Sequence, residues 1–179
     1  EATIERGHVD LGPKIVDSKP EILARDDSGE TPIWRPLDTL VFRVSDSGQL
    51  QVPSDPSYAF LHAHEGESYW VIPQTQNPKV VWLGWNTQDP ELIKVMGSGA
   101  TMTLGNLQGP GQAWLFLQDG AFGAPTVLYD SSTSSQSDIW VEANTHVHAN
   151  WAFSAPGAYA LSVRWCFGDK ETPQCVADT

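Results

Sequence analysis

The sequence lacks any long hydrophobic run and is poor in basic residues. No apolar segment reaches the roughly 18 residues of a membrane-spanning helix, so we expect no span in this chain. Ten lysines and arginines stand against 22 aspartates and glutamates, and the net charge is −12. A chain this acidic, without a basic patch, repels the phosphate backbone of nucleic acids. We therefore exclude nucleic acid as a partner.

Cysteine is equally scarce, because Cys166 and Cys175 are the only two. The polar residues between them predict an exposed loop, residues 166–175, closed by a local disulfide. In the chain-entropy model such a loop stabilises the fold by roughly 2–3 kcal/mol. A disulfide persists in an oxidising compartment, which predicts a secreted protein whose signal peptide has been removed before Glu1. Two free thiols in a cytosolic protein are the alternative, and the spacing excludes a CxxC metal site.

Common catalytic motifs are missing as well. No GxSxG, HExxH, GxGxxG or P-loop pattern occurs, and no serine or cysteine stands in the context of a nucleophile. The sequence thus leaves enzymatic activity open and favours a binding protein.

What is present favours β-structure. Fifteen glycines and thirteen prolines, with 40% hydrophobic residues, suit short strands joined by turns. Residues 40–44 alternate strictly between the two sides of a strand. Strand-like runs recur at 68–72, 79–84, 100–104, 113–117, 126–129, 139–141, 146–153 and 159–165. We predict an all-β class: one antiparallel β-sandwich domain over residues 1–179, Greek-key or immunoglobulin-like, with at most one short helical turn at 89–95.

The five histidines are clustered: His8 stands alone, and His62 with His64 and His146 with His148 form pairs. In a strand, residues two apart project on the same side. The second pair therefore shares one face, whereas the alternate apolar residues from Val147 to Phe153 form the core face. The strand rise places the two Cα atoms about 7 Å apart, so both imidazoles can reach one ion.

Further ligands must come from elsewhere, and His8 and Asp10 lie on one side of another alternating segment. Imidazole with carboxylate suits zinc, copper, nickel or iron. Such a site should weaken in acid, because only neutral imidazole coordinates. Solvated or hydrogen-bonded histidines are an equally weighted alternative. For His62 and His64, beside an acidic turn, surface exposure is the preferred interpretation.

A second group of candidates consists of polar and aromatic residues. Trp82 and Trp85 offer a stacking platform for sugar rings, although core packing is the better interpretation. Gln74 and Asn150 are candidate substrate-binding amides, and backbone hydrogen bonding is the alternative for Gln74. The two tryptophans support a second hypothesis, a carbohydrate-binding module. A third hypothesis is a metal-dependent secreted enzyme that uses zinc or copper, because three histidines could hold a catalytic metal with an open position.

Five motifs occur in order over most of the chain: GHVD at 7–10, WVIPQTQ at 70–76, WLGWNT at 82–87, HVHANWAF at 146–153 and PGAY at 156–159. Together they resemble the actinobacterial surface-anchored protein domain. The resemblance implies a secreted or wall-associated β domain, often encoded beside metal-type ABC transporters, with zinc as the suspected cargo.

Carried over by position, the first motif of that family implies His8 and Asp10 as ligands. The HxHxNW motif implies His146, His148 and, less directly, Asn150. We therefore predict a zinc-binding protein of a metal-acquisition system, with a transporter component or cell-wall polysaccharide as possible partners.

Overall fold

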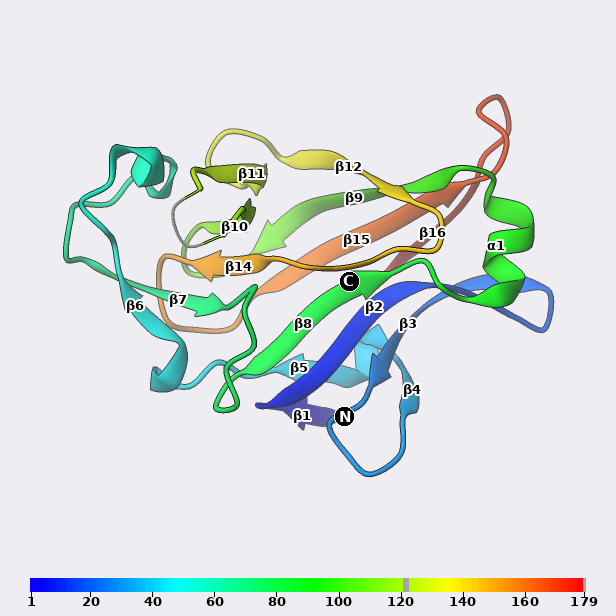
Figure 1. The fold of residues 1–179 in the computed structure, drawn as a ribbon, viewed down its shortest axis with the longest axis horizontal. Helices are drawn as coiled ribbons and strands as arrows, with labels where there is room; N and C mark the ends of the chain where they lie inside the picture. The colour runs from blue at the N-terminus through cyan, green and yellow to red at the C-terminus, as the bar shows by residue number, and fades with distance from the viewer. Residues whose placement is uncertain (121–122, 179) are drawn as a thin grey trace.

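The structure is a computed structural model that describes residues 1–120 and 123–178. It is built from short and medium strands, which confirms the predicted all-β, sandwich-like class (Figure 1). The strands are β1 (Ala2–Ile4), β2 (Gly7–Val16), β3 (Lys19–Asp26), β4 (Ile33–Pro36), β5 (Leu40–Phe42), β6 (Gln49–Gln51), β7 (Ser68–Ile72), β8 (Val81–Asn86), β9 (Gly99–Gln108), β10 (Ala113–Gln118), β11 (Pro125–Asp130), β12 (Gln136–Glu142), β13 (His146–His148), β14 (Asn150–Phe153), β15 (Ala160–Phe167) and β16 (Gln174–Asp178).

Three sheets carry most of the fold. Their strand orders are β13-β8-β2-β3-β4, β12-β9-β15-β16 and β11-β10-β14-β7-β6, and β1 pairs with β5 in a small fourth sheet. Most pairings are antiparallel, as predicted, but β2 with β8 and β1 with β5 are parallel. The parallel pair of β2 and β8 lies in the middle of the sheet that carries the candidate site.

The helical segments are short. The α-helix α1 (Pro90–Met96) agrees closely with the predicted turn at 89–95. Asp89 caps it, since its Oδ2 accepts a hydrogen bond from the backbone N–H of Leu92 at 2.9 Å, and Pro90 occupies the first helical position. The other Asp89 oxygen lies 2.7 Å from Lys14 Nζ, which fastens the helix to β2. Three 3₁₀ segments, η1 (Leu37–Thr39), η2 (Asp46–Gly48) and η3 (Pro56–Leu61), join other elements.

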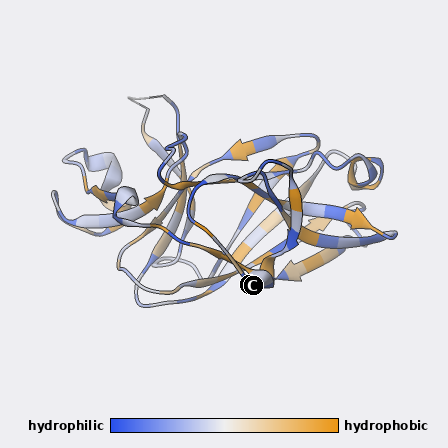
Figure 2. Cartoon of the chain, turned by 90° about the horizontal axis from the view of Figure 1, so that it is seen from below, coloured by the Kyte–Doolittle hydropathy of each residue, from blue (hydrophilic) through white to orange (hydrophobic). Residues whose placement is uncertain are grey.

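The main core lies between the sheets. In β8, Leu83 and Trp85 are 4% and 2% exposed and belong to this core, together with Val9 and Leu11 of β2 and Met102 of β9. Figure 2 shows the origin of this arrangement, because hydrophobic and hydrophilic residues alternate along several strands. The alternation leaves the opposite face of β2 and β8 for polar side chains.

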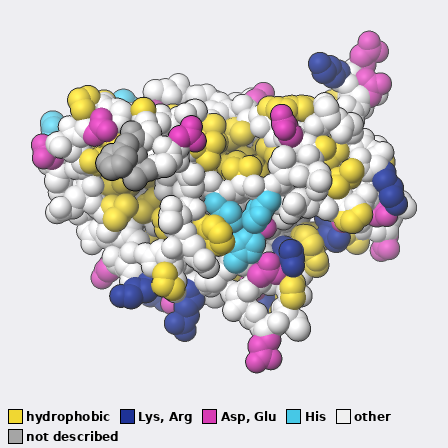
Figure 3. Space-filling view, in the orientation of Figure 1, with side chains coloured by type: hydrophobic (Ala, Val, Ile, Leu, Met, Phe, Trp, Pro, Cys, Tyr) yellow, Lys and Arg dark blue, Asp and Glu magenta, His cyan; other side chains and the backbone are white. Residues whose placement is uncertain are grey.

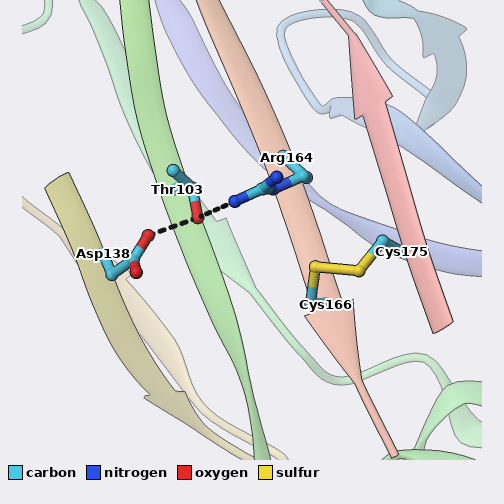
Figure 4. The surroundings of a disulfide bond; sticks show 5 residues. All are labelled: Thr103, Asp138, Arg164, Cys166 and Cys175. Carbon is cyan, nitrogen blue, oxygen red and sulfur yellow. Dashed lines mark hydrogen bonds between the residues drawn. A yellow bond between two sulfur atoms is a disulfide. The ribbon is translucent and has the colours of Figure 1, made fainter. Parts of the chain in front are cut away.

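The predicted disulfide is present. Cys166 on β15 and Cys175 on β16 are directly paired residues of adjacent strands, so the bond closes a hairpin (Figure 4). Beside it, Thr103 on β9 donates a hydrogen bond to Asp138 on β12 at 2.6 Å and accepts one from Arg164 on β15 at 3.5 Å. Polar contacts thus cross three strands of this sheet. Within the described residues, no helix is long and apolar enough to cross a membrane.

The predicted strand at 146–153 is wrong in one respect. It is two strands in two different sheets, β13 paired with β8 and β14 paired with β10 and β7. The change of sheet occurs at Ala149, which is fully buried. As a result, Asn150 does not continue the face that carries His146 and His148.

Candidate metal centre

The candidate site lies on one face of the sheet formed by β13, β8 and β2. Strand pairing sets its layout, because paired residues of neighbouring strands project on the same face. His8 pairs with Trp82 across β2 and β8, and Asp10 pairs with Gly84. On the other side of β8, His148 also pairs with Gly84, and His146 pairs with Asn86. The register therefore brings three histidines and one aspartate around the middle of β8.

Gly84 makes this convergence possible. A Cβ at this position would lie 2.8 Å from Asp10 Oδ1, 2.8 Å from His148 Cε1 and 2.5 Å from the carbonyl oxygen of Val147. Any side chain on Gly84 would occupy the space in which the flanking strands place their polar groups. A glycine inside a strand often marks such a close approach.

Four ligand atoms meet above this glycine: the Nε2 atoms of His8, His146 and His148, and Oδ1 of Asp10. The nitrogens lie 3.0 Å apart for His146 with His148, 3.1 Å for His8 with His148 and 3.4 Å for His8 with His146. The Asp10 oxygen is 3.0 Å from His146, 3.3 Å from His8 and 3.6 Å from His148. All six separations are nearly equal, so the four atoms form a compact tetrahedron.

The size of this tetrahedron matches a metal ion. A regular tetrahedron with edges of about 3.2 Å has its centre about 2.0 Å from each corner, which is the usual length of Zn–N and Zn–O bonds. Hydrogen bonding does not explain the arrangement equally well, because one proton can bridge only one pair of imidazole nitrogens. A cation at the centre would attract all four lone pairs at once.

Charge supports the same interpretation. Asp10 is only 2% exposed, and among the described residues no lysine or arginine forms an ion pair with it. Buried carboxylates normally pair with a cation or coordinate a metal. The Oδ2 atom of Asp10 accepts a hydrogen bond from Asn86 at 3.2 Å, which orients Oδ1 toward the histidines.

Outer contacts also fix His8. Its Nδ1 lies 3.1 Å from Oδ2 of Asp27, whose backbone N–H donates to the carbonyl oxygen of His8 at 2.9 Å. Because a carboxylate accepts, Nδ1 carries the proton and donates it, which leaves the lone pair on Nε2 directed at the other ligands. A carboxylate partner of this kind is typical of metal-binding histidines.

His148 is held by an aromatic wall. Trp82 stacks on its ring with centroids 3.9 Å apart and an angle of 13°, and the His8 ring lies 5.2 Å from the same indole. Burial is the main reason that the pKa of His148 falls to about 4; the Asp10 carboxylate opposes this shift, and the His146 and His8 imidazoles add to it. His148 is therefore neutral at neutral pH and has no proton to lose before it coordinates.

The structure separates the other sequence candidates from the ligand set. Asn150 and Gln74 bind each other, since the Gln74 backbone N–H donates to Asn150 Oδ1 at 2.9 Å. The Gln74 carbonyl oxygen accepts a hydrogen bond from Trp82 Nε1 at 2.8 Å. The side-chain amide of Gln74 bonds the backbone of Gln118, donating to its carbonyl oxygen at 3.2 Å and accepting from its N–H at 2.8 Å, which agrees with the backbone-bonding alternative for Gln74.

The burial of Trp85 contradicts the hypothesis that Trp82 and Trp85 form a stacking platform for sugar rings. It is 2% exposed and meets Trp151 edge to face in the core, on the opposite side of β8 from Trp82. Two residues three apart in a strand face opposite ways, so the pair cannot form one platform.

His62 and His64 lie outside the four-residue group. The side chain of His62 is 57% exposed, with Nε2 3.9 Å from Asp130 Oδ2. The backbone N–H of His64 donates to Glu67 Oε2 at 3.0 Å. The preferred interpretation of these two as surface residues agrees with this placement. Figure 3 shows the histidine side chains of the candidate site, which reach the surface in the middle of one face, next to hydrophobic side chains.

Sequence reasoning missed Asp27, Asn86 and Gly84. Only Gly84 carried a local signal, as a glycine inside an otherwise aromatic and apolar strand. The roles of Asp27 and Asn86 depend on the register between strands.

Comparison with known proteins adds no further information on this site. The chain matches no protein-family model, no curated protein and no solved structure. The resemblance to the actinobacterial surface-anchored protein domain therefore stays a prediction.

Proposed function

We propose that this chain is a metal-binding protein that holds one zinc ion through His8, Asp10, His146 and His148. The observation that carries the proposal is the set of six nearly equal separations among the four ligand atoms, from 3.0 to 3.6 Å. Zinc prefers tetrahedral coordination by nitrogen and oxygen at such distances. Copper binds the same donor types but favours square-planar or tetragonal geometry as Cu(II), so zinc fits the arrangement better.

The number of ligands favours binding over catalysis. Catalytic zinc sites keep three protein ligands and an open position for water or substrate, whereas sites with four protein ligands are closed. Here the fourth corner is the buried Asp10 carboxylate, which Asn86 holds in place. The geometry thus supports capture of an ion rather than turnover.

A secreted location belongs to the same proposal. The disulfide between Cys166 and Cys175 is suited to an oxidising compartment. A net charge of −12 attracts cations to the protein surface. A role in metal acquisition, with an ABC transporter component as partner, follows only from the family resemblance and is proposed on that basis.

Zinc titration of metal-free protein tests this function. We expect one tightly bound zinc ion per chain, measured by competition with a chromophoric chelator. His148→Ala should weaken binding by at least about tenfold, because loss of a ligand costs at least as much as loss of a supporting contact. His62→Ala is the matched control, as an exposed histidine outside the group. Equal affinity in wild type and His148→Ala would contradict the assignment.

A further inference from the structure

The four ligands differ in how firmly the protein holds them. Asp27 fixes His8, Asn86 fixes Asp10, and Trp82 stacks on His148. His146 has no such support: among the residues that the structure describes, its hydrogen-bond contacts are with members of the ligand group only, through Nε2. Three ligands are thus held in place from outside the group, and one is not.

The solvent exposure of the four side chains also separates His146 from the other three ligands. The side chains of Asp10 and His148 are 3% and 8% exposed, that of His8 is 21% exposed and that of His146 is 35% exposed. Solvent and dissolved ligands therefore reach the metal position most directly past His146. The stack of Trp82 covers the His148 side.

The position of β13 adds to this asymmetry. This strand has three residues, pairs only with β8 and forms the edge of its sheet. The turn before it contains Asn144, with a positive φ of 57°. By contrast, His8 and Asp10 lie on β2, which is paired on both sides with long partners. A short edge strand opens locally at lower free energy than a central strand. The strand also carries His148, but the stacked indole of Trp82 holds that ring, so the difference falls on His146 at the first position of the strand.

We propose that His146 is the exchange ligand of the centre, the one that an incoming donor replaces first when the ion is loaded or released. This inference rests on the proposed function and adds how the ion moves. An incoming imidazole, carboxylate or thiolate donates a lone pair to the metal on the exposed side, and the lone pair of His146 leaves. His8, Asp10 and His148 keep the ion during this step, so it is never without three protein ligands.

Two consequences separate this route from simple dissociation. Release should accelerate as the concentration of acceptor rises, because the acceptor joins the metal before the protein ligands leave. A small ligand should also replace the His146 side chain from solvent, whereas it should not reach the covered position of His148.

The test uses the full chain loaded with Co²⁺, whose visible absorption reports the ligand set. Stopped-flow mixing with increasing excess of a chromophoric chelator gives the release rate. We expect this rate to rise in proportion to chelator concentration in wild type and in the control His62→Ala. In His146→Gly the rate should rise by about tenfold or more, since loss of a ligand opens the coordination sphere.

Rescue by free imidazole completes the experiment. Imidazole should restore slow release and the four-ligand cobalt spectrum in His146→Gly but not in His148→Gly. Release that is independent of chelator concentration, or equal rescue of both variants, would overturn this inference while leaving the metal site intact. Wild-type protein that binds no Co²⁺ or Zn²⁺ would overturn the proposed function and this inference with it.

Discussion

Replacing Gly84 by alanine tests how the centre is built, because the change adds one methyl group and removes no ligand. The added Cβ would lie 2.8 Å from both Asp10 Oδ1 and His148 Cε1, and 2.5 Å from the backbone carbonyl oxygen of Val147. Non-bonded heavy atoms pack best at about 3.5 Å or more, so each of these two ligands would have to retreat by about 0.7 Å. Metal sites tolerate deviations of only about 0.2 Å in ligand distance.

The expected result is a protein that folds but binds zinc poorly. Strain from an extra methyl group in a packed site costs about 1–3 kcal/mol of folding free energy, and we expect the upper end of this range because the closest contact is with the backbone of β13. The backbone of Gly84 has no positive φ, so alanine adds no conformational strain of its own. Displacement of two of the four ligands should weaken zinc binding by about 10–100-fold, the range seen when supporting contacts are lost.

Zinc affinity by chelator competition and thermal unfolding with and without zinc measure the two effects separately. Gly29→Ala is the matched control, because a Cβ there meets nothing within 4 Å. If Gly84→Ala binds zinc as tightly as Gly29→Ala, the four atoms do not act together as one site. The register argument for the centre would then be refuted.

Three further predictions concern the support of the site and of the fold. Asp27→Ala should weaken zinc binding by about 10–100-fold in chelator competition, because His8 loses its orienting partner; unchanged affinity would contradict that role. Asp89→Ala should lower the free energy of urea unfolding at pH 7 by about 0.5–2 kcal/mol. Burial alone would raise the pKa of Asp89, but hydrogen bonds from Lys14 and two backbone N–H groups hold it below 3.8. The stabilisation that the Asp89 carboxylate provides is therefore fully present above pH 3.8, its ordinary pKa, and is lost as the pH falls through the lower pKa of the folded state. If wild type and Asp89→Ala still differ in unfolding free energy in strong acid, this account is wrong. Reduction of Cys166–Cys175 should lower the unfolding free energy by about 2–3 kcal/mol, and an unchanged urea midpoint would show that the hairpin is held by other contacts.

Much of the ligand set was predictable because strand geometry is regular. A period of two puts His146 and His148 on one side of a strand, and His8 and Asp10 on one side of another. What the sequence could not predict is that these strands flank β8 on either side. The parallel register of β2 with β8 joins residues more than 70 positions apart, and no local pattern encodes it.

The fold shows the same limit at residues 146–153. The alternation of polar and apolar residues continues through this segment, so period two alone predicts one strand. Ala149, fully buried, instead marks the transfer from one sheet to another. The sequence likewise did not indicate that Trp82 stacks on the imidazole ring of His148.

The change of sheet at Ala149 links the candidate site to a second sheet. His148 lies on the face of one sheet, and Asn150 lies two residues on in another sheet, where it accepts a hydrogen bond from Gln74. Gln74 in turn holds the indole of Trp82, which stacks on His148. This closed path, built from side-chain and backbone contacts, sets the orientation of a ligand without any ion. The contacts of Asp27 and Asn86 do the same for the other two supported ligands. The fold thus holds three of the four candidate ligands from outside the group, whereas the hydrogen-bond contacts of His146 in the described residues are all within it.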